Sequence, residues 1–168
     1  EFSPAGRVSW AWPRIRAGDK KPIAFTDLRG ARAGKTAAKV DKRLARSEPM
    51  PLAGVPFAVK NLFDVKGIPT RAGSKINRER KPAPHDSVLI ERLEEQGAVL
   101  VGALNMGEYA YDFTGENVHD GNACNPHNLA HMTGGSPRGS GAAVGPRFVP
   151  LPFGSDTHGS VPAPAPLL

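Results

Sequence analysis

The segment "DSVLIERLEEQGAVLVGAL", residues 86–104, decides the fold. Apolar residues recur at helical spacing over residues 88–93, and Asp86 or Ser87 can cap the helix directly before them. Gly97 stands where helices commonly end in a left-handed residue. The last seven residues are an unbroken apolar run, which is typical of a buried strand. A helix that passes directly into such a strand predicts an α/β layer.

The segments around this unit extend the pattern. Residues 55–63, "VPFAVKNLF", form a mostly apolar run of the kind that buried strands show. Residues 31–48 are rich in Ala, Lys and Arg and predict a helix. The other expected elements are a short strand over 22–28, a short helix over 106–112 capped by Asn105, a glycine turn with a small-residue helix over 134–145, and a strand over 148–156. We expect residues 1–21 to be irregular, and neither a repeat nor a linker divides the chain.

The chain is basic, with a net charge of +6 and many of its Lys and Arg residues before residue 47. A basic face can attract nucleic acid or an anionic membrane. No interleaved aromatic residues or groove-reading motif accompany these charges, so we interpret them as a solvated helix surface and expect no nucleic-acid partner. The alternative is a non-catalytic subunit whose basic first third binds an acidic partner.

The cysteine content and the apolar runs bear on the compartment. Cys124 is the only cysteine, so an internal disulfide cannot form, which agrees with a reducing, cytoplasmic compartment. No apolar run reaches eighteen residues, and residues 1–21 lack the apolar core of a signal peptide, so we expect no membrane association. His127 and His131 have the spacing of two metal ligands on one helix face, but no third ligand is evident and Asn-Pro before them favours a loop.

The segment "GGSPRGSGAAVGPRFVPLPFGSDTHGS", residues 134–160, places a glycine before each of its four serines. Glycine allows a backbone to approach a substrate closely, and successive N–H groups can then stabilise an oxyanion. A serine nucleophile also needs a base, and His158 is too near Ser160 in the chain to take its proton. Lys60 is the candidate base because it stands inside an apolar run. Burial would lower its pKa and keep it neutral, whereas a lysine that reaches water from a strand end would have no such role.

These motifs together resemble the amidase signature family of Ser–Ser–Lys amidohydrolases. The resemblance covers residues 22–161 and rests on "PLAGVPFAVKNLFDVKGIPTRAGSK", "GAVLVGALNMGEYAYDFTGENVHDG", "NPHN", "TGGS-x-x-GSGAAV" and "GSDTHGS". Within the family, the second of these motifs looks closest to the carboxybiuret hydrolase-like branch. The resemblance implies an α/β fold with a mixed, largely parallel sheet flanked by helices, and it implies neither a metal nor a cofactor.

The resemblance also implies roles for individual residues. Lys60 would be the neutral general base, Ser136 the bridging serine that relays the proton, and Ser160 the nucleophile that forms an acyl-enzyme. The oxyanion hole would consist of backbone N–H groups, those of Thr157, His158, Gly159 and Ser160 itself. Ser140 is interpreted as a cap at the start of a helix, and Ser155 as a residue that only shapes the approach to the turn. The expected reaction is hydrolysis of a linear amide bond in a small molecule, by a protein that forms a homo-oligomer or binds a small accessory subunit.

The chain departs from the family pattern near its end. Pro137 and Arg138 stand where the family has small residues in a tight turn, and "SVPAPAPLL" replaces the Ile-Arg whose arginine would support Asp156. Residues 162–168 are divergent and proline-rich, and the family domain is longer than this chain. We therefore expect residues 1–168 to be the N-terminal part of a single amidase domain. The alternative prediction for its function is an inactive, truncated amidase fragment.

Overall fold

The computed structural model describes residues 3–19, 23–111, 116–133 and 138–155. Its main sheet has four strands in the order β1-β3-β2-β6. These strands are β1 (Phe25–Leu28), β2 (Pro56–Lys60), β3 (Val99–Leu104) and β6 (Leu151–Phe153). β2 pairs in parallel with both β3 and β6, and β1 pairs antiparallel with β3. The predicted mixed, largely parallel sheet is therefore confirmed.

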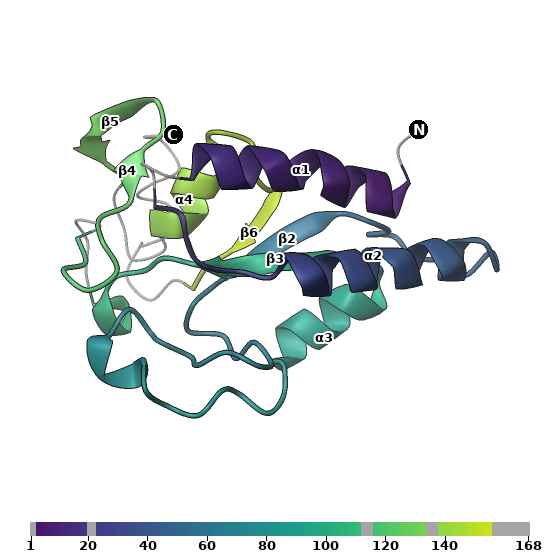
Figure 1. Ribbon diagram of the computed structural model, residues 1–168, viewed down its shortest axis with the longest axis horizontal. Helices are drawn as coiled ribbons and strands as arrows, with labels where there is room; N and C mark the ends of the chain where they lie inside the picture. The colour runs from purple at the N-terminus through teal and green to yellow at the C-terminus, as the bar shows by residue number, and fades with distance from the viewer. Residues whose placement is uncertain (1–2, 20–22, 112–115, 134–137, 156–168) are drawn as a thin grey trace.

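Helices cover both faces of the sheet (Figure 1). One face carries α1 (Pro4–Gly18), α2 (Gly30–Leu44) and α4 (Arg138–Val144), and the other carries α3 (Val88–Glu95). The side chains of β2 therefore alternate between the two faces of the sheet. Phe57 and Val59 pack with α3, whereas Ala58 packs with α1, α2 and α4. Both faces are buried, which explains the unbroken apolar runs in β2 and β3.

The unit that carries α3 and β3 matches its prediction. Gly97 has φ of +92°, the left-handed conformation expected at the end of a helix. Ser87 occupies the N-cap position, but its side chain does not cap a backbone N–H. The Asp86 carboxylate forms a bidentate ion pair with Arg32 of α2, with N–O distances of 2.7 and 2.8 Å. This ion pair attaches the start of α3 to α2, and Ser87 does not cap the helix with its side chain.

The expectation that residues 1–21 are irregular is wrong. Residues Pro4–Gly18 form α1, in which the Ser3 hydroxyl accepts a hydrogen bond from the Gly6 N–H at 3.1 Å. Pro4 occupies the first turn, where a missing N–H costs nothing. Buried Val8, Ala11 and Ile15 recur every three to four residues, and they pack the helix against the sheet.

The prediction of a short helix over residues 106–112 is also wrong. Only a 3₁₀ turn, η2 (Glu108–Ala110), forms there, and Gly107 rather than Asn105 precedes it. The carboxamide of Asn105 donates hydrogen bonds to the carbonyls of Ile23 and Gly121 instead. Asn105 is therefore a buried connector between three segments at the end of β3. The remaining elements are η1 (Lys75–Asn77) and a hairpin of β4 (Cys124–Asn125) and β5 (Asn128–Met132).

Among the helices in the described ranges, none is both long enough and apolar enough to cross a membrane.

Candidate active site

Lys60 is the last residue of β2 and its side chain is 0 % exposed. It lies two residues after Ala58, so it points to the face that α4 helps to cover. A lysine that reached water from a strand end would be exposed, so that interpretation of Lys60 is wrong. A fully buried amine is costly in its charged form, because burial removes the water that stabilises the charge.

The Lys60 amine meets a serine from the neighbouring strand. Its Nζ lies 2.9 Å from the Ser155 Oγ and 3.5 Å from the Ser155 carbonyl oxygen. Ser155 follows β6, and the parallel pairing of β2 with β6 brings the two residues together at the carboxyl ends of both strands. Open parallel sheets place their ligand sites at this edge. Ser155 therefore does more than shape a turn, and sequence reasoning missed its contact with Lys60.

Helix α4 approaches the same edge of the sheet very closely. The Gly139 N–H donates to the Asn105 carbonyl at 3.0 Å. A Cβ atom at Gly139 would lie only 2.5 Å from the Ala24 carbonyl oxygen and from the Asn105 nitrogen. No side chain fits into that space, so the glycine allows α4 to begin beside the start of β1 and the end of β3.

Two other residues at the start of α4 differ from expectation. Ser140 is the third residue of the helix, and its buried Oγ has no hydrogen-bond partner in the part of the chain that the structure describes, so it is not the expected cap. Arg138 is completely buried, and its guanidinium donates to the Glu116 carbonyl at 2.8 Å. The bulky cation thus lies within the protein and links α4 to the segment that precedes the β4–β5 hairpin.

The other predicted site residues lie outside the described residues. These are the bridging serine, the nucleophile and the oxyanion-hole residues, namely Ser136, Ser160, Thr157, His158 and Gly159. Pro137 and Asp156 lie outside them as well. Of the predicted catalytic residues, the structure therefore describes Lys60, at the carboxyl end of β2.

A network of charges lies next to this edge. Arg71 binds the Asp27 carboxylate at 3.1 Å and lies 3.6 Å from the Asp120 carboxylate, which in turn binds Arg78 at 2.7 Å. Burial raises the pKa of Asp27, and the nearby Arg71 partly offsets this effect. The network joins β1 to the loops that follow β2 and β3.

The structure gives no support for a metal site at the two histidines. His127 lies in the turn of the β4–β5 hairpin and His131 lies on β5, so the two do not share a helix face. Within the described ranges, no group of three or more His, Cys, Asp or Glu residues could hold a metal ion.

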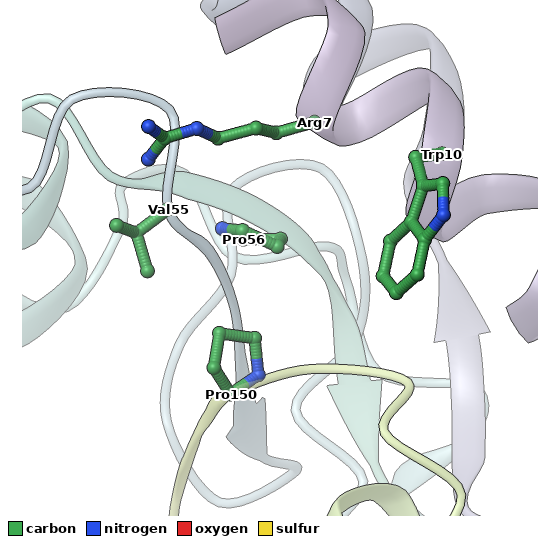
Figure 2. Close-up of a pocket in the computed structure, with 5 residues that line it drawn as sticks. All are labelled: Arg7, Trp10, Val55, Pro56 and Pro150. Carbon is green, nitrogen blue, oxygen red and sulfur yellow. The ribbon is translucent and has the colours of Figure 1, made fainter. Parts of the chain in front are cut away.

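A groove of about 320 Å³ opens at the opposite end of β2. Figure 2 shows its lining residues, which are Arg7, Trp10, Val55, Pro56 and Pro150. The lining is almost entirely apolar, and the groove lies at the amino end of the strand whose carboxyl end carries Lys60. Lys60, the candidate catalytic residue that the structure describes, does not line this groove.

Comparison with known proteins identifies the family. The family model Amidase matches residues 8–167, so the chain belongs to the amidase family. It is 54 % identical over 154 residues to AtzE, a 1-carboxybiuret hydrolase subunit of Pseudomonas sp. (strain ADP), and the match covers 91 % of this chain and 34 % of that protein. It is 43 % identical over 152 residues to a glutamyl-tRNA(Gln) amidotransferase subunit of Salinispora tropica, covering 90 % of this chain and 31 % of that protein.

Solved structures agree with this assignment. A vestigial protein complex that reveals the origins of an s-triazine catabolic enzyme contains a chain with a TM-score of 0.95 and 50 % identity, with 98 % of this chain and 36 % of that chain covered. The peptide amidase of Stenotrophomonas maltophilia gives a TM-score of 0.89 at 29 % identity, with 98 % and 35 % covered. The chain spans about a third of the length of these relatives.

Proposed function

We propose that this chain belongs to an amidohydrolase that cleaves a linear amide bond of a small molecule through an acyl-enzyme on Ser160. The observation that carries the proposal is the fully buried Lys60 amine beside the Ser155 hydroxyl, at the carboxyl edge of the sheet. A lysine in this setting can act as a neutral base, because burial disfavours its ammonium form. The family assignment and the glycine-flanked serines supply the other parts of the proposal.

In the proposed reaction, Lys60 accepts a proton from Ser136, which in turn accepts the proton of Ser160. The Ser160 oxygen attacks the amide carbon, and the N–H groups of Thr157, His158 and Gly159 stabilise the resulting oxyanion. The tetrahedral intermediate collapses, the proton returns to the leaving nitrogen, and the amine departs. Water then attacks the acyl-enzyme by the same proton path and releases the acid. Side chains and backbone N–H groups of this chain carry each of these steps.

The relatives suggest what the substrate and the partners are. AtzE belongs to a carboxybiuret hydrolase as one of its subunits, and the related amidotransferase protein is also one subunit of its enzyme. We accordingly propose that the substrate is a small amide, that the partner is a second copy of the protein or a small accessory subunit, and that the location is cytoplasmic.

A fluorophosphonate probe tests the proposed nucleophile, because it reacts covalently with activated serines. We expect mass spectrometry of the digested protein to place the adduct on Ser160. Ser160→Ala should abolish the adduct, whereas Ser140→Ala, the matched control, should leave it in place. A sample that melts cooperatively and yet carries no adduct would support an inactive fragment and would overturn the proposal.

A further inference from the structure

Asn61 directly follows Lys60 and is only 1 % exposed. Its backbone N–H donates to the Leu104 carbonyl at 3.0 Å, and its own carbonyl accepts from the Ala72 N–H at 2.8 Å. Ala72 has φ of +48°, a left-handed conformation that a residue other than glycine adopts only when its surroundings hold it. The backbone of Asn61 thus joins the end of β2 to β3 and to a strained loop.

The carboxamide of Asn61 makes three further hydrogen bonds. Its Nδ2 donates to the Thr26 Oγ1 at 2.6 Å and to the Asp27 Oδ2 at 3.3 Å, while its Oδ1 accepts from the Arg71 N–H at 3.1 Å. The Thr26 hydroxyl donates to the Ala103 carbonyl, so it must accept from Asn61. Both N–H groups and the carbonyl of the amide are therefore in use. The two N–H groups reach residues of β1 across the intervening β3.

The same geometry explains why this position requires an amide. Asp27 is held on its other side by Arg71, at 3.1 Å from the Oδ1. A carboxylate at position 61 would lose both donors and would face the Asp27 carboxylate in a partly buried setting. Asparagine and aspartate have nearly the same shape, so the hydrogen-bond donors and the charge decide between them.

We propose that Asn61 is a positioning residue whose carboxamide ties the end of β2 to β1 and thereby holds Lys60 in place. Lys60 is the last residue of its strand, so the bonds of the next residue determine where its main chain ends. The amine then meets Ser155 on the opposite side, next to β6. The catalytic meaning of this placement rests on the proposed function, whereas the placement itself does not.

The test compares Asn61→Asp with a variant that exchanges the two groups, Asn61→Asp combined with Asp27→Asn. The single change should lower the melting temperature by about 5 °C or more, because it removes two donors and creates a repulsion. The exchanged pair regains a donor and contains one carboxylate, so it should recover at least half of that loss. Asn128→Asp is the matched control: this exposed residue accepts a hydrogen bond from the Ala130 N–H, which aspartate can also accept, so the replacement should change nothing.

A second readout reports on Lys60 itself and does not need turnover. In protein labelled with ¹³C at the lysine Cε, the Lys60 signal is the one that Lys60→Met removes. We expect Asn61→Asp to displace this signal by more than its linewidth, the exchanged pair to bring it back toward the wild-type position, and Asn128→Asp to leave it unmoved. An unmoved signal in Asn61→Asp would reduce Asn61 to a structural role and overturn the proposal.

The outcomes separate this inference from the proposed function. If Asn61→Asp does not fold, the double variant Asn61→Asp with Asp27→Asn tests the positioning role. A double variant that is unfolded, or whose Lys60 signal is displaced from the wild-type position, overturns that role. A Lys60 signal that responds as expected, in a protein whose Ser160 does not react with fluorophosphonate, would support the positioning role and overturn only the proposed function.

Discussion

Asp19 should make the stability of this protein depend on pH in an unusual direction. Its carboxylate oxygens accept hydrogen bonds from the backbone N–H groups of Ala24 and Phe25, at 2.6 and 3.1 Å, and so join the end of α1 to the start of β1. Burial raises the pKa of Asp19 from 3.8 to about 6, and the two hydrogen bonds only partly offset this effect.

The sign of the effect follows from the raised pKa. The folded protein binds the proton more tightly than the unfolded chain, so the stabilisation is complete below pH 3.8 and is lost as the pH rises through about 6. The difference between the two pKa values corresponds to at most about 3 kcal/mol of unfolding free energy. Because the side chain is only partly buried, solvent screening reduces this to about 2 kcal/mol.

The assay is urea unfolding of wild type and Asp19→Asn between pH 4 and pH 8. Asparagine does not titrate, so the difference between the two proteins isolates this group, and wild type should lose about 2 kcal/mol relative to the variant between pH 4 and pH 7. Glu79→Gln, which removes a charge from an exposed residue, should show no such trend. A difference that stays constant, or that grows in favour of wild type as the pH rises, would refute the reasoning.

Two further predictions concern packing. Gly139→Ala should lower the unfolding free energy, measured by calorimetry, by more than about 2 kcal/mol, because the new Cβ would lie 2.5 Å from the Asn105 nitrogen. Gly34→Ala on α2 is the matched control and should not destabilise the protein, because a Cβ there would meet nothing within 4 Å. Phe57→Ala should cost about 3–5 kcal/mol in urea unfolding, because a fully buried ring that meets Phe153 edge-on at 6.1 Å is removed from the core. A loss below about 1 kcal/mol in either variant would contradict the packing described for it.

The parts of the fold that could be predicted are those whose signals are local. The α3–β3 unit follows from the spacing of its apolar residues and from Gly97, which takes the left-handed conformation that glycine allows. Helix α1 was not predicted, although a proline in the first turn favours a helix, because its burial depends on the sheet on which Val8, Ala11 and Ile15 pack. Asn105 was misread as a cap because a polar residue after a strand has the same local sequence in either role.

One part of the candidate site could likewise be predicted from the sequence, and another part could not. Lys60 could be found because a charged residue inside an apolar run is anomalous in the sequence itself. Its contact with Ser155 could not, because the two residues are 95 positions apart and meet only through the parallel pairing of β2 with β6. The bonds of Asn61 to β1 depend on strand order for the same reason.

The most direct test of the account is the rate at which a fluorophosphonate labels Ser160 in Lys60→Arg. Arginine is a basic side chain of similar size, but its guanidinium stays charged and cannot become a neutral base, so labelling should fall by about a hundredfold or more. Lys39→Arg, at an exposed position on α2, should label like wild type. If Lys60→Arg labels within twofold of wild type while retaining its cooperative melt, Lys60 is not the base and the proposed mechanism is wrong.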